Sequence, residues 1–193
     1  MSTQKSIKLS DYLEYPYLIP RIYLDFDIAK DYVVVKSSMI IKPKLKESSK
    51  LIFQGNNVKL LSISINGKEL KLDEYSISDK ELIIDSPPIS EFELKIISQI
   101  DPFRNTSLEG LYLSSGMLTT QCEAEGFRSI CYHPDRPDVL SKYVVRIEAE
   151  KASYPILLSN GNKKYSGDLK NNNQRHEIIW EDPYPKPCYL FAL

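Results

Sequence analysis

The sequence predicts an antiparallel all-β domain. Apolar and polar residues alternate with a period of two along much of the chain, and Asn-Gly or Pro turns separate these short runs. No window carries an apolar stripe of helical period with recognisable caps. There is also no internal repeat or low-complexity segment. We therefore expect residues 1–193 to form one domain.

The clearest strands lie in the first half of the chain. Residues 22–28 place an apolar side chain at every second position, with Asp25 and Asp27 on the opposite face, which is typical of a half-buried strand. Residues 1–21 contain Pro16 and Pro20 and are expected to be a polar lead-in. Further strands are expected over 32–41, 51–53, 59–65, 75–77, 81–84 and 92–97.

Turn residues predict how these strands connect. Asn66-Gly67 follows one apolar run and precedes another, and both residue types tolerate positive φ, so a tight hairpin is expected there. Residues 78–80 predict a second hairpin between the strands that flank them. Pro87 and Pro88 then interrupt the pattern before the next strand.

The second half is predicted to continue in the same style. A loop over 101–108 precedes a strand over 111–119, and Asp135 is a suitable N-cap for a short helix over 135–140. Asn160-Gly161 predicts a hairpin between strands at 155–158 and near 164–165. A polar turn is expected over 170–174. Other strands are expected over 143–149, 176–180 and 188–193.

Composition excludes several classes of protein. The chain has 25 basic and 26 acidic residues, a net charge of −1, so bulk electrostatics favour neither nucleic acid nor an anionic membrane. No run reaches the apolar length of a membrane span, and the first residues lack the apolar region of a secretory signal. Three cysteines without a CxxC pair indicate reduced thiols, so we expect a cytoplasmic protein.

Candidate chemistry concentrates between residues 120 and 138, where acids, arginines, an amide, two thiols and a histidine occur together. His133 and His176 lack the spacing of a zinc site such as His-Glu-x-x-His. No Gly-x-Ser-x-Gly elbow is present. Cys122 and Cys131 are expected to be small buried side chains, although a thiol enzyme remains a third hypothesis.

Two glutamates in this segment have two interpretations. Glu123 and Glu125 could attract a cation, most simply an ammonium group, or could be a solvated pair. Arg128, Asp135 and Arg136 could form ion pairs that brace the loop. The residues alone leave both interpretations open.

The string TQCEAEGFR at 120–128 resembles the aminopeptidase N family of zinc peptidases, and specifically its bacterial alanyl aminopeptidase branch. The resemblance extends through 105–112, 135–140, 154–161 and 182–193. The wider family has Gln-x-Glu, then Arg, then Asp-Glu-Pro. Arg136 stands where the Asp-Glu-Pro motif has its glutamate, a departure typical of the bacterial branch. The matching positions are Gln121, Glu123, Arg128, Asp135 and Pro137.

This resemblance implies a saddle-shaped, sandwich-like β domain that precedes a catalytic domain. Glu123 would anchor the free α-amine of a peptide substrate, and Gln121 would line the pocket for the first side chain. The resemblance places zinc in the full-length enzyme, on ligands outside this chain. The family's Gly-Ala-Met-Glu-Asn and His-Glu-x-x-His motifs are absent here. The isolated chain is therefore predicted neither to bind zinc stoichiometrically nor to hydrolyse peptides.

The alternative is a β-sandwich module that binds another protein and has no catalytic role. It predicts a chain that stops at Leu193 with Leu190, Phe191 and Leu193 covered. The aminopeptidase hypothesis predicts that the natural chain continues into its catalytic domain, since an apolar strand left open at the surface would be unfavourable.

Overall fold

In the computed structural model, which describes residues 8–45 and 49–193, every regular element is a β-strand or a short 3₁₀ turn. The all-β prediction is thereby confirmed. The first seven residues of the expected lead-in lie outside the described residues. The strands are β1 (Tyr17–Ile28), β2 (Val33–Pro43), β3 (Leu51–Gln54), β4 (Lys59–Ile65), β5 (Lys68–Glu69), β6 (Ser76–Ile77), β7 (Glu81–Ile84), β8 (Phe92–Ile100), β9 (Gly110–Ser114), β10 (Met117–Gln121), β11 (Ser141–Glu150), β12 (Asn162–Leu169) and β13 (Asn172–Lys186).

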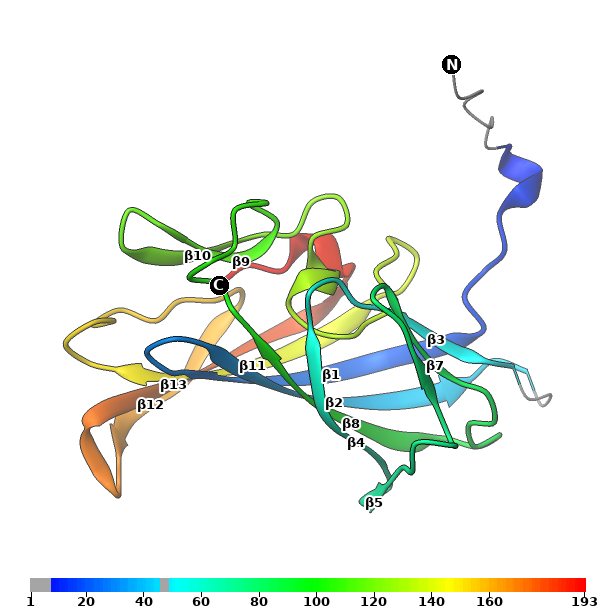
Figure 1. Cartoon of the computed structure of the whole chain (residues 1–193), viewed down its shortest axis with the longest axis horizontal. Coiled ribbons are helices and arrows are strands. Elements are labelled where there is room, and N and C mark those ends of the chain that lie inside the picture. Colours follow the sequence, from blue (N-terminus) through cyan, green and yellow to red (C-terminus); the bar gives the residue numbers. More distant parts are fainter. Residues whose placement is uncertain (1–7, 46–48) are drawn as a thin grey trace.

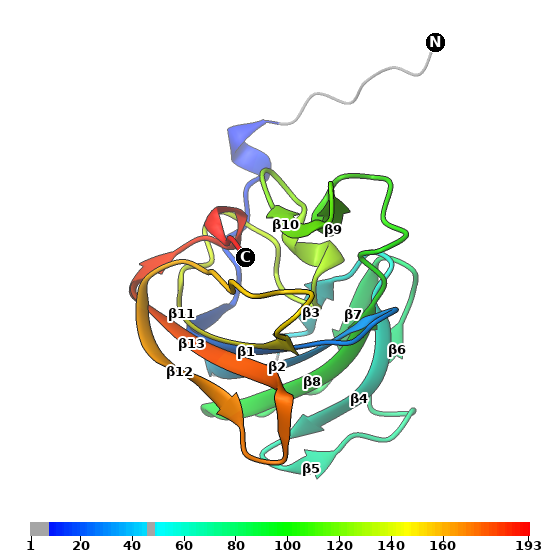
Figure 2. The same cartoon turned by 90° about the vertical axis from the view of Figure 1, so that its left-hand side faces the viewer.

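The strands form one large sheet and two small ones. The large sheet has the order β12-β13-β11-β1-β2-β8-β4-β5, while β10-β9 and β3-β7-β6 form separate sheets. Figures 1 and 2 show the large sheet curving beneath the two small ones. This is the expected sandwich-like arrangement, and it places β9 and β10 above the middle of the large sheet.

Alternation along the central strands creates the core. On β1, Ile22, Leu24 and Phe26 are each at most 1% exposed, while Asp25 and Asp27 point to the opposite face. The neighbouring strands β2, β8 and β11 alternate in the same way. Burial of one apolar face per strand drives the two layers together. The buried residues of all three sheets belong to a single hydrophobic cluster.

One strand pair departs from the antiparallel prediction. β1 runs parallel to β11, in register from Arg21 opposite Lys142 to Asp27 opposite Glu148. Parallel neighbours need a long crossover, and here the crossover contains all the strands from β2 to β10. The segment from β10 to β11 packs into the core, where Phe127 and His133 are buried and His133 forms a β-bridge with Gln54 of β3.

The first strand is longer than predicted. β1 begins at Tyr17, so part of the supposed lead-in belongs to the sheet. A register shift between Leu18 and Arg21 accommodates Pro20, because a bulge tolerates a residue without a backbone N–H. Tyr17 and Ile19 are buried and lengthen the core face of the strand.

The predicted strand over 111–119 is in fact a hairpin. β9 and β10 pair from Ser114 with Met117 to Gly110 with Gln121. The turn between them consists of Ser115 and Gly116, with φ values of 50° and 84°. Two consecutive positive φ values match the tight turns that suit the twist of a hairpin. Ser-Gly is a weaker signal for such a turn than Asn-Gly.

The predicted helix over 135–140 does not form. The carboxylate of Asp135 turns inward to accept a hydrogen bond from the Arg128 backbone N–H, so it does not cap a helix. Residues 155–158 are also not a strand, and Asn160-Gly161 is not a hairpin turn. The Asn160 side chain instead accepts a hydrogen bond from the Ala192 backbone N–H at 2.7 Å. The true hairpin partner of β13 is β12, and the polar turn expected over 170–174 contains their connection.

The predicted strand over 188–193 is wrong as well. The 3₁₀ turn η3 (Cys188–Leu190) and an irregular extended segment occupy these positions. Phe191 is buried, Leu193 is half-buried and Leu190 is half exposed, so the covering that the interaction-module hypothesis expects is incomplete. Side-chain packing of Phe191, and not strand pairing in a sheet, holds this segment in place.

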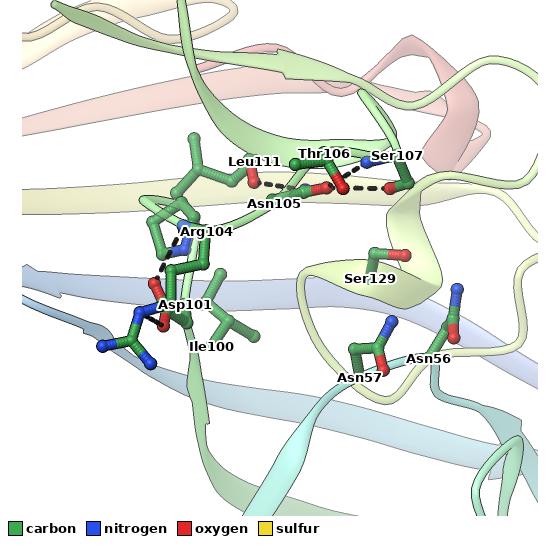
Figure 3. A pocket seen from close by; sticks show the side chains of 11 residues that line it. Asn56, Asn57, Ile100, Asp101, Arg104, Asn105, Thr106, Ser107, Leu111 and Ser129 are labelled. Atoms are coloured by element: carbon green, nitrogen blue, oxygen red, sulfur yellow. Dashed lines mark hydrogen bonds and ion pairs between the residues drawn. The ribbon is translucent and has the colours of Figure 1, made fainter.

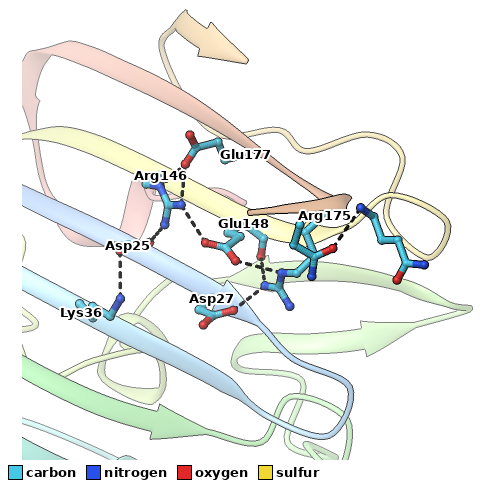
Figure 4. A network of polar contacts seen from close by, with 9 residues as sticks. Asp25, Asp27, Lys36, Arg146, Glu148, Arg175 and Glu177 are labelled. Atoms are coloured by element: carbon cyan, nitrogen blue, oxygen red, sulfur yellow. Dashed lines mark hydrogen bonds and ion pairs between the residues drawn. The ribbon is translucent and has the colours of Figure 1, made fainter. Parts of the chain in front are cut away.

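The outer face of the large sheet carries an ion-pair network (Figure 4). Arg146 on β11 lies 2.8 Å from both Asp25 and Glu148, and Arg175 on β13 lies 2.5 Å from Asp27. Alternation explains the network, because these side chains come from positions facing away from the core. Among the residues that the structure describes, no helix is long and apolar enough to cross a membrane.

Candidate functional site

The candidate site is the turn that follows β10. Gln121 ends the strand, Cys122 is buried beneath it, and Glu123 and Glu125 are exposed. The Gln121 side-chain amide donates to the carbonyl of Glu123 at 3.0 Å. The structure therefore brings together the two residues that the sequence proposed as a substrate-binding pair. The peptide bond between Glu123 and Ala124 is cis.

Tight backbone packing fixes this turn. Gly126 donates its backbone N–H to the carbonyl of Cys122 at 2.9 Å, which closes the turn. A Cβ on Gly126 would lie 2.3 Å from the Gln121 carbonyl oxygen and 3.0 Å from the Gly110 nitrogen. Only glycine fits this approach of backbone to backbone. The 3₁₀ turn η2 (Phe127–Ser129) follows immediately and anchors Phe127 in the core.

The two glutamates differ in their partners. Glu125 lies 3.3 Å from the Arg128 guanidinium, with its side chain 69% exposed. The Glu123 carboxylate is exposed and has no hydrogen bond or ion pair to any other described residue. Glu125 thus joins the ion pairs of the loop through Arg128, whereas the carboxylate of Glu123 has no such partner among the described residues.

The arginines of the segment form the structural ion pairs that the sequence suggested. Arg128 Nε lies 3.0 Å from the buried carboxylate of Asp135, and Arg136 lies 2.7 Å from Asp138. The hydrogen bond from Arg136 lowers the pKa of Asp138 to about 2. Both pairs stabilise the loop between η2 and β11.

The histidines have no metal-binding partners within the described parts of the chain. His133 is fully buried, both ring nitrogens lack a hydrogen-bond partner there, and burial lowers its pKa to about 4. His176 Nε2 lies 2.7 Å from the carbonyl oxygen of Tyr154. No group of three His, Cys, Asp or Glu residues in residues 8–45 and 49–193 could hold a metal ion. The described residues therefore do not fit a zinc site.

The thiols have the environment of inert side chains. Cys122, Cys131 and Cys188 are all free and buried. Burial raises the pKa of Cys122 to about 12 and raises that of Cys131 further, so neither forms a thiolate readily at neutral pH. These environments argue against the thiol-enzyme hypothesis.

Two cavities lie close to this region. A cavity of about 360 Å³ has a mixed lining of polar residues, among them Asn56, Asn57, Asp101, Asn105 and Ser129, and apolar ones such as Ile100 and Leu111 (Figure 3). The Asn105 side-chain amide donates to the backbone carbonyls of Glu109 and of Leu111 on β9, so it has a structural role there. An apolar cavity of about 550 Å³ adjoins β10 and is lined mainly by residues 116–119, 153–158 and 193.

Comparison with known proteins identifies the family of this chain. The sequence profile of the peptidase M1 N-terminal domain matches residues 19–190. The chain belongs to the peptidase M1 N-terminal domain family. This confirms the resemblance, which was inferred mainly from residues 105–193.

Individual relatives agree with the assignment. Aminopeptidase N of Escherichia coli strain K12 is 45% identical over 184 residues, which cover 95% of this chain and 20% of that protein. Aminopeptidase N of Caulobacter vibrioides is 44% identical and covers 99% of this chain and 22% of the relative. The crystal structure of Legionella pneumophila aminopeptidase A in complex with aspartic acid matches with a TM-score of 0.88 at 36% identity, over 96% of this chain and 22% of that one. The chain thus spans about one fifth of the length of the curated relatives it matches.

Sequence reasoning missed two residues that build the site. Gln54 on β3 accepts a hydrogen bond from the Asp135 backbone N–H at 3.1 Å, and the Cys188 thiol donates to the Asp135 carboxylate at 3.0 Å. These partners lie 81 and 53 residues away from Asp135 in the sequence. No local pattern signals contacts over such separations.

Proposed function

We propose that this chain is the N-terminal domain of a zinc-dependent aminopeptidase that releases amino acids from the N-termini of peptides. In this proposal Glu123 anchors the free α-amine of the substrate, and Gln121 lines the pocket for the first side chain and helps to hold the amine. The observation that carries the assignment is the exposed carboxylate of Glu123, which has no ion-pair or hydrogen-bond partner among residues 8–45 and 49–193, in a member of the peptidase M1 N-terminal domain family.

The chemistry of an exopeptidase supports this role. An aminopeptidase must recognise a free N-terminus, and an α-amine with a pKa of about 8 is mostly an ammonium ion at neutral pH. In this proposal the catalytic domain covers the exposed Glu123 in the full-length enzyme, and in the resulting water-poor cleft a carboxylate is the natural acceptor for the several N–H donors of the amine. Because Glu125 is already paired with Arg128, Glu123 is the better candidate of the two.

The hydrolytic centre belongs elsewhere in this proposal. We infer that a catalytic domain following this one binds the zinc ion, since the described residues of this chain offer no suitable ligand set. The length of the relatives, about five times that of the match, supports such a partner domain. Zinc would supply Lewis-acid chemistry there, and this chain would contribute substrate binding.

We also infer a cytoplasmic location. Its support is the pattern of three buried cysteines, none in a disulfide, which suits a reducing compartment. Peptide N-termini are the expected substrates. The nearly balanced charge gives no reason to expect a nucleic-acid partner.

The test is Glu123→Ala in the full-length enzyme, with Glu125→Ala as the matched control. Loss of a desolvated charge pair should lower kcat/KM for a dipeptide by about 30-fold or more, a penalty of at least about 2 kcal/mol. Glu125→Ala should lower it much less, because that carboxylate pairs with Arg128 at the surface. Unchanged kinetics for Glu123→Ala, with a normal thermal unfolding curve, would refute the amine-anchor assignment.

A further inference from the structure

Asp135 is an acid buried where no substrate could reach it. Its side chain is 1% exposed, and both carboxylate oxygens accept hydrogen bonds. Oδ2 accepts from the backbone N–H of Arg128 and from its Nε, each at 3.0 Å, and Oδ1 accepts from the thiol of Cys188 at 3.0 Å. A carboxylate offers only acceptors, so it satisfies three donors that an amide could not satisfy together.

The backbone around Asp135 is held equally firmly. Its N–H donates to the Gln54 side chain at 3.1 Å, and two residues earlier His133 exchanges backbone hydrogen bonds with Gln54, at 3.0 and 3.2 Å. Gln54 lies on β3, in one of the small sheets. Asp135 is therefore fixed to the sheet framework and not merely to its own loop.

Arg128 connects this fixed carboxylate to the candidate site. It lies in η2, which begins one residue after Gly126, and the Gly126 N–H closes the turn onto the Cys122 carbonyl at 2.9 Å. Its guanidinium also reaches Glu125 at 3.3 Å. The turn that contains Glu123 is thus attached at its far end to an arginine that Asp135 holds through both backbone and side chain.

The second oxygen of Asp135 ties in another segment. Cys188 begins η3, and this segment continues to Leu193, whose N–H donates to the Thr120 hydroxyl at 2.9 Å. Thr120 immediately precedes Gln121 on β10. The turn with Glu123 is therefore held on its C-terminal side by Arg128 and on its N-terminal side, through Thr120, by the segment from Cys188 to Leu193. Asp135 contacts both Arg128 and Cys188.

We propose that Asp135 is a positioning residue for substrate binding, acting through Arg128 and Cys188 to hold the carboxylate of Glu123 where it meets the α-amine. This inference rests on the proposed function. A binding group must be kept near its productive position by supporting contacts, because small displacements weaken charge-assisted hydrogen bonds steeply. Asp135 itself touches no substrate.

The test compares two inhibitors in the full-length enzyme. One is an amino acid hydroxamate, and the other is the matched hydroxamate without the α-amine. The ratio of their inhibition constants reports how well the enzyme holds the amine. A purely structural role would lower the amount of active enzyme and leave this ratio unchanged.

Asp135→Asn should weaken binding of the amine-bearing inhibitor about fivefold more than binding of the amine-free one, a loss in the range of one impaired charged hydrogen bond. The matched control is Asp138→Asn, which breaks the ion pair with Arg136 on the same loop and should leave the ratio within about twofold. Arg128→Lys provides a second variant that keeps the charge but loses the Nε contact with Asp135, and Arg136→Lys is its control.

The outcomes separate the two proposals. If Glu123→Ala changes the ratio but Asp135→Asn and Arg128→Lys do not, the positioning role is wrong and the amine anchor stands. If Glu123→Ala leaves the ratio unchanged, the amine anchor is wrong, and the positioning role falls with it. Should Asp135→Asn fail to fold, Arg128→Lys decides the question by the same ratio.

Discussion

Replacing Phe191 with alanine tests how the irregular segment after η3 is held. The Phe191 side chain is 3% exposed, and its ring centroid lies 5.3 Å from that of Phe127, 5.9 Å from Tyr143 and 6.0 Å from Phe26. Three aromatic neighbours thus surround a residue that belongs to no strand. Without the ring, a cavity would open between the segment and the large sheet.

Packing sets the expected magnitude. Burial of a phenylalanine in a rigid core makes the change to alanine cost about 3–5 kcal/mol of unfolding free energy. The Phe191 segment is irregular and can relax into the space, although Leu193 and Ala192 remain hydrogen-bonded to Thr120 and Asn160. We therefore expect a loss near the lower end of this range, about 3 kcal/mol.

Urea unfolding of the 193-residue chain, followed by far-ultraviolet circular dichroism, measures this loss. The control is Leu190→Ala in the same segment, where the side chain is 50% exposed and the cost should be about 0.5 kcal/mol or less. A loss below about 1 kcal/mol for Phe191→Ala, or one equal to that of the control, would contradict the claim that ring packing holds the segment.

Three further predictions concern the core, the turn and the outer face. Burial lowers the pKa of His133 from 6.5 to about 4, so the unfolded chain binds an extra proton between these values. As the pH drops from about 6.5 to about 4, the free energy of unfolding should therefore fall by roughly 3 kcal/mol because of His133. His133→Leu should flatten this pH dependence, which urea titrations at several pH values would measure. Gly126→Ala should lower the melting temperature more than Gly67→Ala, because a Cβ on Gly126 would lie 2.3 Å from the Gln121 carbonyl oxygen. A Cβ on Gly67 would have no atom within 4 Å, so that substitution costs only the strain of a positive φ. Arg146→Gln should destabilise the chain by about 1 kcal/mol in low salt and by less in high salt, because it removes the partner shared by Asp25, Glu148 and Glu177.

Each of these predictions can fail clearly. An unchanged slope of stability against pH in His133→Leu would show that another group governs acid sensitivity. Equal melting temperatures for Gly126→Ala and Gly67→Ala would mean that the turn can move away from the new methyl group. A loss in Arg146→Gln that does not depend on salt would point to packing of the arginine stem and not to its charge.

The sequence determined the β character of the chain and most of its central strands. Period-two alternation decides these elements, since each strand needs only one apolar face to join the core. The Asn66-Gly67 hairpin was predictable for an equally local reason, as both residues reach positive φ at little cost. The substrate-binding pair also came from sequence, through the family resemblance at Gln121 and Glu123, and it remains a prediction.

The errors arose where local pattern and tertiary packing disagree. Residues 188–193 are apolar enough for a strand, yet Phe191 enters an aromatic cluster from an irregular segment. Asp135 has the properties of a helix N-cap, yet its carboxylate turns inward to Arg128 and Cys188. In both cases a distant partner competes with the local structure, and the sequence does not say which partner is near.

Apart from the family resemblance, it is the tertiary structure that distinguishes Glu123 from Glu125. The two acids are two residues apart and chemically alike, so the sequence alone left both open to a cation. The fold pairs Glu125 with Arg128, which is held by Asp135, and leaves Glu123 exposed. The physical reason is that an ion pair depends on positions in space, and the hydrogen bonds that set those positions join residues far apart in the chain.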